Sequence, residues 1–379
     1  MAGDRARQVA IGLAAAATIA LSAQEPPPNF RAEINYVQLP VRVLDANGQF
    51  VSGLRLADFQ VLEDGKPQTI TSFTLVDIPF VPPGSTTSSP STPGSALSAS
   101  DEEIPQIDGR AYLFVLDDLS ANPDDTIKVR NLMHAFIRER LSANDMAAIR
   151  VVGGTRGQNF TLNHQLLHDA VDRFIGERDD GPTTRVSANR VVDTITTMVE
   201  WLGSIRGRRK ALVWVSSSTV CSLNDEECRE PLQHALRVTM QSDVSIHVID
   251  PVGLGRVDRR SRAEHANPNS SYGANGYVEA SSGAAARAAF GEFRTSVRGP
   301  LDGARYLAEE SGGIALVNMI DLRPGLDRIV REMSSYYLLG YYSTNARTDG
   351  KFRRNRVAVA QKDVRVVHRN GYFAARGSK

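Results

Sequence analysis

The chain has 379 residues, of which 41% are hydrophobic and 23% are charged, a composition typical of a globular protein with room for more than one domain. Lys and Arg together number 44 against 43 Asp and Glu, so the formal net charge is +1. So balanced a chain has no global field that would attract nucleic acid or an anionic membrane surface. We therefore expect no nucleic-acid partner.

The N-terminus is typical of an export signal. Arg5 and Arg7 precede the apolar run VAIGLAAAATIAL, and the small residues Ser22 and Ala23 follow it. We expect cleavage after Ser22 or Ala23, which makes residues 1–23 a signal peptide and the mature protein periplasmic, outer-surface or secreted. No later segment approaches the roughly 20 apolar residues of a membrane-spanning helix, so no transmembrane segment is predicted.

Cys221 and Cys228 are the only cysteines of the chain, and they enclose the short segment CSLNDEEC. Because disulfides persist in exported proteins, we predict a local Cys221–Cys228 bridge. Two free, partly buried thiols are the alternative. A zinc site would need more nearby ligands than His234.

Residues 30–79 predict a small β domain. Their hydrophobic pattern alternates in period two, and the dipeptides Asn47-Gly48 and Asp64-Gly65 are turn signals between β-rich runs. Residues 80–109 are rich in Pro, Ser and Thr without periodicity. Since such a composition cannot bury a core, we interpret them as a flexible linker or a long exposed loop.

From residue 110 onward, strands and helices alternate, which predicts an α/β domain with a mostly parallel sheet covered on both faces. A first predicted helix, residues 123–141, has an apolar stripe that we expect to face the core: Ile127, Leu132, Phe136, Ile137 and Leu141. The later predicted elements are strands at 147–152, 210–216 and 244–250 and helices at 164–175, 188–205, 229–242 and 322–334. Residues 251–299, rich in Gly, Ala, Ser and Asn, predict a flexible insertion. Residues 350–374 predict a C-terminal β hairpin that pairs RNRVAVA with DVRVVHR.

Several segments, in this order, resemble one known group of proteins. YLFVLDDLS, GRRKALVWVSSS, LAEESGGIALV and SSYYLLGYYST, with VRVLDANGQFVSGLRLADFQVLEDGKPQ upstream and the closing NGYF, are similar to the exported bacterial family of acidobacterial-type von Willebrand factor A-related proteins. The resemblance covers nearly the whole mature chain apart from the linker and the insertion. It implies a three-layer von Willebrand factor A domain over residues 110–343, with a mainly parallel central sheet, one antiparallel edge strand and a preceding β domain.

The same resemblance implies a place for a metal-ion-dependent adhesion site. In that fold an Asp-x-Ser-x-Ser loop after the first strand, a Thr from a second loop and an Asp after the fourth strand hold Mg²⁺. Hard oxygen ligands of this kind suit the ion. In this chain the strand AYLFVL runs into Asp117 and Asp118, and the threonine would be Thr183 or Thr184.

The loop departs from that pattern in either register. If Asp117 takes the first place, Leu119 and Ala121 fill the two Ser places, and neither can bind a metal. If Asp118 takes it, Ser120 fits and Asn122 replaces the second Ser. In addition, the strand KALVWV is followed by Ser216, Ser217 and Ser218 where the last Asp is expected. The resemblance thus implies a degenerate site. Mg²⁺ would bind weakly there, through side-chain oxygens of Asp117, Asp118, Ser120, Asn122 and Ser216.

A structural interpretation of the same loop competes with the metal site. Asn122, immediately before Pro123, is typical of a helix N-cap, and Asp124 and Asp125 in the first turn complement the helix dipole. Asp117 then ends the strand by accepting backbone N–H bonds.

Signatures of catalysis are weak in this sequence. His164 and His168 lie four residues apart in HQLLH, but the Glu of a zinc protease motif is absent, so a solvated helix face is expected. Nucleophile elbows and phosphate-binding loops are likewise missing. The basic runs at Arg206–Lys210 and Arg353–Arg356 are interpreted as solvated residues that flank buried strands.

The sequence therefore predicts a non-enzymatic, exported binding or scaffold protein that presents the top of its sheet to a protein partner in the cell envelope. An envelope-associated hydrolase with an unrecognised site is the alternative from another class, and a purely structural envelope component is the third.

Overall fold

The computed structural model describes residues 35–82, 109–154, 157–177, 184–217, 226–252, 302–317 and 319–375, with backbone alone at 184–189 and 302. These residues belong to one compact unit that begins at Asn35. The predicted signal peptide, most of the predicted linker and nearly all of the predicted insertion lie outside the described residues.

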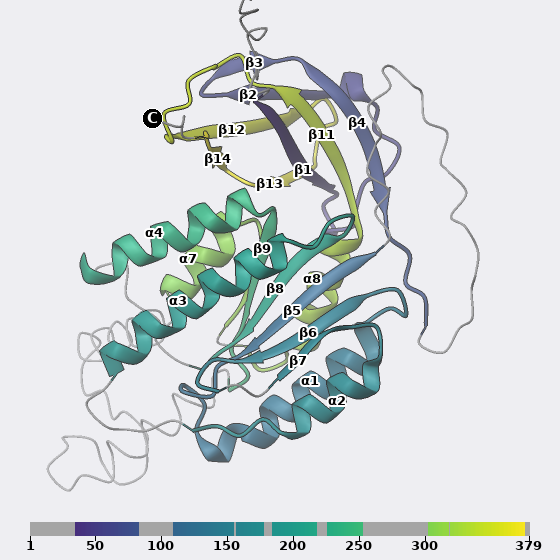
Figure 1. Cartoon of the computed structure of the whole chain (residues 1–379). Helices are drawn as coiled ribbons and strands as arrows, with labels where there is room; N and C mark the ends of the chain where they lie inside the picture. The colour runs from purple at the N-terminus through teal and green to yellow at the C-terminus, as the bar shows by residue number, and fades with distance from the viewer. Residues whose placement is uncertain are drawn as a thin grey trace, which may run out of the picture. The chain divides into compact units, whose positions relative to one another are not determined.

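A six-stranded sheet forms the centre of the α/β part, in the strand order β10-β9-β8-β5-β6-β7 (Figure 1). Neighbouring strands are parallel except for the edge strand β7, which runs antiparallel to β6. Counted from β5, this is the doubly wound order 3-2-1-4-5-6. The predicted mainly parallel sheet with one antiparallel edge strand is confirmed. Its strands are β5 (Arg110–Leu116), β6 (Met146–Val151), β7 (Gly157–Thr161), β8 (Arg209–Val215), β9 (Val244–Ile249) and β10 (Ala315–Leu316).

Helices cover both faces of this sheet (Figure 1). One face packs against α3 (Thr184–Gly203), α4 (Glu226–Gln241) and α7 (Asp302–Glu310). The other packs against α1 (Thr126–Arg140), α2 (His164–Asp172) and α8 (Arg323–Ser334). The short 3-10 helix η2 (Pro123–Asp125) precedes α1.

Strand β5 shows why the apolar runs form central strands. All seven of its residues are buried, and successive side chains enter opposite cores. Leu113 and Val115 pack with α3 and α4, whereas Phe114 packs edge-on against Phe136 of α1 with ring centroids 5.1 Å apart. A continuous apolar run is therefore needed to fill both faces.

Helix α1 corrects one detail of the predicted core. Phe136, Ile137 and Leu141 are buried as expected, but Ile127 is 60% exposed. Val129 and Met133 take the inner face in its place. Nine residues separate Ile127 from Phe136 within α1, and at about 100° per residue this spacing places their side chains on opposite faces of the helix.

The N-terminal and C-terminal strands form two antiparallel sheets, β13-β1-β11-β4 and β14-β12-β2-β3, which we call the β module. Both sheets contribute to one core, in which Leu39 and Tyr341 from the first sheet lie with Val61 and Val357 from the second. The strands are β1 (Tyr36–Leu44), β2 (Phe59–Glu63), β3 (Lys66–Gln68), β4 (Ile70–Asp77), β11 (Ser335–Tyr342), β12 (Phe352–Val359), β13 (Arg365–His368) and β14 (Gly371–Phe373), and the 3-10 helix η1 (Leu56–Asp58) precedes β2.

The β module changes the interpretation of the C-terminal segment. The predicted pairing of RNRVAVA with DVRVVHR is wrong: β12 pairs with β2 and β14, whereas β13 pairs with β1. Both strands alternate in period two, and that pattern does not specify a partner. The turn signal at Asp64-Gly65 is confirmed, since both residues have positive φ between β2 and β3.

No helix in the described part of the chain is long and apolar enough to cross a membrane.

Candidate functional site

The candidate site lies where β5 and β8 end side by side. Strand β5 is flanked by β6 on one side and β8 on the other, so the strand order reverses beside it. Ligands of open α/β sheets bind outside the carboxyl ends of the strands at such a point. Asp117, the first residue after β5, donates its backbone N–H to Val215 O at 2.9 Å, which holds the two strand ends together.

Three predicted site residues meet at this edge. Asp117 is 2% exposed, and its Oδ2 accepts a hydrogen bond from Ser216 Oγ at 2.7 Å while its Oδ1 accepts one from Ser120 N at 3.2 Å. Ser120 Oγ lies 3.1 Å from Ser216 Oγ and accepts from Ser217 N at 3.1 Å. The serines thus surround the carboxylate of Asp117, which also accepts the backbone N–H expected of a strand-ending residue.

Burial sets the charge state of this cluster. It raises the pKa of Asp117 to about 6, and the hydrogen bonds from Ser216 and Ser120 counteract part of that shift. The neighbouring carboxylate of Asp118 raises the pKa further. At neutral pH, Asp117 is therefore mostly ionised but close to its titration range.

Asp118 takes part in a different set of contacts. Its Oδ1 accepts a hydrogen bond from Gly153 N, beyond the end of β6, at 2.8 Å, and its backbone O accepts from Glu177 N at 2.8 Å. Burial raises the pKa of Asp118, and these contacts place its carboxylate toward β6. In the structure, therefore, Ser120 and Ser216 contact Asp117, whereas Asp118 holds the loop after β5 against the end of β6.

Asn122 occupies the N-cap position of η2, with extended backbone angles and Pro123 as the first residue of the 3-10 helix. Its side chain does not cap the helix, in contrast to the expectation. Asn122 O accepts from Asp125 N at 2.9 Å, and Asn122 Nδ2 lies 3.5 Å from Asp125 Oδ2. Asn122 thus orders the loop through its backbone.

Among known proteins, no protein-family model matches this sequence, and no curated protein matches it. The resemblance to von Willebrand factor A-related proteins stays a prediction.

Metal binding has limited support at this edge. Among the described residues, no group of three or more His, Cys, Asp or Glu side chains is arranged to hold a metal ion. Thr183 lies outside the described residues, and only the backbone of Thr184 is described. The predicted Mg²⁺ site stays a prediction.

A further acidic residue at the same edge was missed by the sequence interpretation. Asp250 follows β9, is 2% exposed, and accepts Val252 N at 3.1 Å through its Oδ1. Ser216 N donates to Ile249 O at 3.0 Å, so the ends of β8 and β9 are adjacent. The signal was available, because VSIHVID ends in an acid after an apolar strand as AYLFVLD does.

Two other predicted features fall elsewhere. His168 Nδ1 lies 2.7 Å from His134 Nδ1, and His134 Nε2 lies 2.9 Å from Asp172 Oδ1. His134 belongs to another helix, so no spacing within HQLLH could indicate it. Cys228 is buried in α4, whereas Cys221 lies outside the described residues, and the predicted disulfide stays a prediction.

The basic runs need a correction. Arg353 is 4% exposed, and the side chain of Arg209 is 11% exposed, so neither residue is simply solvated as expected. Arg209 of β8 lies over the ring of Tyr336 in β11, 4.9 Å from the ring centroid, a long-range contact that local sequence does not reveal. Arg353 of β12 instead pairs with Asp349, four residues earlier in the chain, at 2.8 Å.

We expect Asp117 to give the protein a specific pH dependence. Its pKa of about 6 in the folded state exceeds the value of 3.8 for a free Asp side chain, so the native state holds the proton more tightly. Stability is therefore lost as pH rises from about 4 to 6, by about 3 kcal/mol from this group. In the Asp117→Asn variant, the free energy of unfolding measured with urea between pH 4 and 7 should not show this decrease. If the free energy of unfolding changed with pH in the same way in both proteins, Asp117 would not be the group responsible.

Proposed function

We propose that the chain is an exported, non-enzymatic binding or scaffold protein, whose α/β part is a von Willebrand factor A-like domain that presents the carboxyl edge of its sheet to a protein partner in the cell envelope. The observation that carries the proposal is the polar cluster of Asp117, Ser120 and Ser216 at the point of strand-order reversal. Such edges are the usual ligand-binding places of doubly wound sheets.

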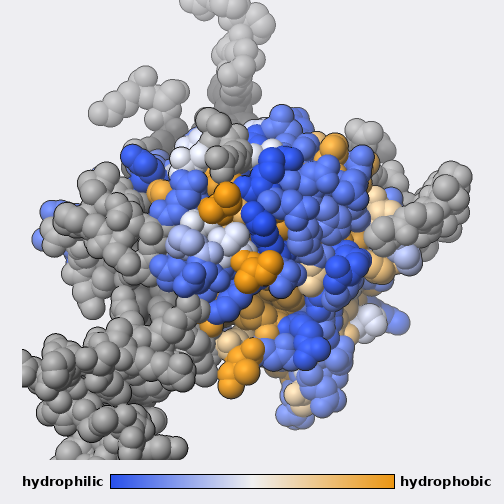
Figure 2. Space-filling view, turned by 90° about the horizontal axis from the view of Figure 1, so that it is seen from below, coloured by the Kyte–Doolittle hydropathy of each residue, from blue (hydrophilic) through white to orange (hydrophobic). Residues whose placement is uncertain are grey.

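The rim of this edge has a surface suited to a protein. Ile127 is 60% exposed and Ile175 is 47% exposed, and a hydrogen bond from Gly176 N to Thr126 Oγ1 at 3.0 Å places the two segments together. The acidic side chains of Asp124 and Glu177 are exposed nearby in the chain. Figure 2 shows small hydrophobic areas within a largely hydrophilic surface in the view from below. Apolar contacts with a charged surround are typical of non-obligate interfaces.

The oxygen atoms around Asp117 and Asp118 favour a degenerate metal site, and they favour partner binding that does not depend on Mg²⁺. Ser216 Oγ and Ser120 N already donate to Asp117, and Asp118 accepts from Gly153 N. A Mg²⁺ ion would have one carboxylate and two hydroxyls in place of the several anionic oxygens that hold such ions tightly. When bound, it would offer a free coordination position to a partner's carboxylate.

A site-specific photo-crosslinker tests the proposal. We would place it at Asp124, which is exposed in η2 four residues after Ser120, and at Lys66 of β3, which is exposed in the β module. Irradiation of intact cells should give a discrete protein adduct from position 124 in the envelope fraction. Position 66 serves as the matched control and should give little adduct.

The same experiment separates the metal-dependent version from the metal-independent one. We expect the adduct yield at position 124 to be unchanged by EDTA, by added Mg²⁺ and by Asp118→Ala. Loss of the adduct with EDTA would support a functional metal site. Equal labelling from both positions, or labelling from neither, would overturn the proposed binding edge.

A further inference from the structure

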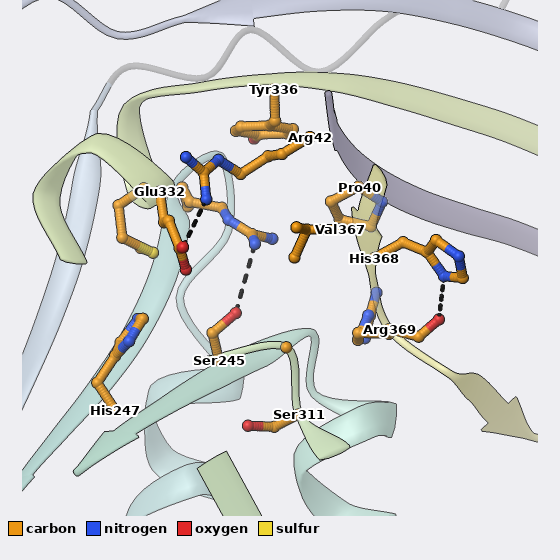
Figure 3. Close-up of a pocket in the computed structure, with 13 residues that line it drawn as sticks. Pro40, Arg42, Ser245, His247, Ser311, Glu332, Tyr336, Val367, His368 and Arg369 are labelled. Atoms are coloured by element: carbon orange, nitrogen blue, oxygen red, sulfur yellow. Dashed lines mark hydrogen bonds and ion pairs between the residues drawn. The ribbon is translucent and has the colours of Figure 1, made fainter. Parts of the chain in front are cut away.

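A small cavity lies at the other end of the sheet, where the starts of β8 and β9 meet β1, β11 and β13 of the β module (Figure 3). Arg42 of β1, Arg209 of β8 and His247 of β9 line it, together with Glu332 of α8. The candidate binding edge described above is at the opposite ends of the strands. The cavity is therefore a separate feature of the fold.

Apart from Arg42 Nη1, which is ion-paired with Glu332, three nitrogen atoms of residues that line this cavity have no hydrogen-bond partner among the described residues: Arg42 Nε, Arg209 Nε and His247 Nε2. His247 is 1% exposed, and the side chain of Arg42 is 9% exposed. Buried donors in native proteins nearly always have a partner, because an unmet one costs about 1–3 kcal/mol. All three belong to residues that line one cavity, which indicates an occupant that accepts hydrogen bonds.

The tautomer of His247 makes it a donor. Its Nδ1 accepts a hydrogen bond from Ile314 N at 3.1 Å, so the proton of the neutral ring is on Nε2. Burial, aided by the charges of Arg209, Arg42 and Arg328, lowers the pKa of His247 to about 3. The ring therefore stays neutral at ordinary pH, and its Nε2–H donates toward the cavity.

Positive charge exceeds negative charge around the cavity. Glu332 Oε1 lies 2.7 Å from Arg42 Nη1 and 3.0 Å from Arg328 Nε. Asp243 Oδ1 lies 2.7 Å from Arg369 Nη2 and 4.0 Å from Arg209 Nη1. Four guanidinium groups thus share two carboxylates. Burial lowers the pKa of the nearby Lys210, and the positive charges of Arg209 and Arg369 lower it further. The electrostatics favour an anion over a neutral acceptor.

The size of the cavity limits the anion. Its volume is about 20 Å³, enough for one occupant of roughly the size of a water molecule. Figure 3 shows Arg42 bonded to Glu332, with Ser245 and His247 below them. Ser245 Oγ, 3.3 Å from Arg209 Nη2, adds a hydroxyl to the lining. A monatomic halide fits this space, whereas phosphate or sulfate is too large.

We propose that this cavity is a chloride-binding site, formed by Arg42, Arg209 and His247, that stabilises the contact between the β module and the α/β sheet. It does not depend on the proposed function. Bound chloride accepts the three unmatched N–H groups and balances part of the excess positive charge. Its chemistry is structural and includes no covalent step.

Bromide provides a direct probe, because it replaces chloride and scatters anomalously. Crystals of the purified protein grown without halide and then exposed to NaBr should show an anomalous peak between Arg42, Arg209 and His247. In solution, replacing sodium gluconate with NaCl at constant ionic strength should raise Tm by about 3 °C for a site that chloride saturates. Sodium sulfate should give no comparable site-specific rise.

Matched variants connect the melting response to the cavity. Arg209→Met and His247→Gln should each lose the chloride-dependent rise, whereas Arg323→Gln, which removes an exposed arginine paired with Asp321, should keep it. If the cavity variants fail to fold, the bromide peak in the unaltered protein still decides the question. A cavity that holds only water, with no bromide peak and no difference between chloride and gluconate, would overturn the proposal.

Discussion

Replacing Asp145 with Ala is expected to lower the free energy of unfolding by about 3–5 kcal/mol, the usual cost of leaving a buried charge without its partner. Arg110 and Asp145 form an ion pair whose side chains are both 0% exposed. Arg110 Nη2 lies 2.7 Å from Asp145 Oδ2, and Arg110 Nε lies 2.9 Å from Asp145 Oδ1. The variant would leave the guanidinium group in the interior with only part of its hydrogen bonds.

The pair joins three parts of the fold, so its loss affects all of them at once. Arg110 begins β5, and its Nη1 donates to Ser334 Oγ at the end of α8 at 2.6 Å. Asp145 precedes β6 and also accepts Ser142 N at 2.8 Å. Loss of the carboxylate therefore affects the start of the central strand, the turn before its neighbour and the adjoining helix together.

Urea unfolding at pH 7 measures the effect, and two further variants test its cause. Arg138→Ala removes an exposed arginine paired with Glu139 and should change stability by less than about 0.5 kcal/mol. The double variant Arg110→Met with Asp145→Leu removes both charges and should recover much of the loss. If the double variant were as unstable as Asp145→Ala, the cost would come from packing and not from an unpaired charge.

Sequence patterns predicted the elements of the α/β part well because buried strands there need continuous apolar runs. AYLFVL and KALVWV are such runs, and they are found as β5 and β8. Arg110 was not predicted as a core residue, since a charged residue at the end of an apolar run is usually solvated. Its burial depends on Asp145, which is 35 residues away in the chain.

The candidate site was predicted in position but not in detail. The resemblance to von Willebrand factor A-related proteins brought Asp117 and Ser216 into consideration, and in the structure Ser216 Oγ lies 2.7 Å from Asp117 Oδ2. Which carboxylate faces the serines depends on the pleat of β5. Odd-numbered side chains such as Leu113 and Val115 enter one core, and Leu116 enters the other. Because side chains alternate between the two faces along a strand, the carboxylates of Asp117 and Asp118 point in different directions. Comparison with the motif alone does not reveal this difference.

Replacing Glu63 is expected to produce the second large effect, because its carboxylate joins the N-terminal and C-terminal strands of the β module. Glu63 is 2% exposed at the end of β2. Its Oε2 accepts from Tyr341 Oη at 3.0 Å and from Tyr372 Oη at 2.9 Å, and its Oε1 accepts from Ser343 Oγ at 2.6 Å. Burial raises the pKa of both tyrosines, so each hydroxyl keeps its proton and donates.

Glu63→Ala would leave these three hydroxyls without their common acceptor, and we expect a loss of about 3 kcal/mol in unfolding free energy. Glu63→Gln keeps one acceptor oxygen and the side-chain volume, so its loss should be smaller, about 1–2 kcal/mol. Gln60→Ala, on the exposed face of the same strand, is the matched control and should have little effect. Amide hydrogen exchange gives the location: in Glu63→Ala, protection should fall in β2, β11 and β12 more than in β5 and β8. Equal losses in both parts, or equal effects of Ala and Gln, would show that the carboxylate is not the group that holds the two ends of the chain together.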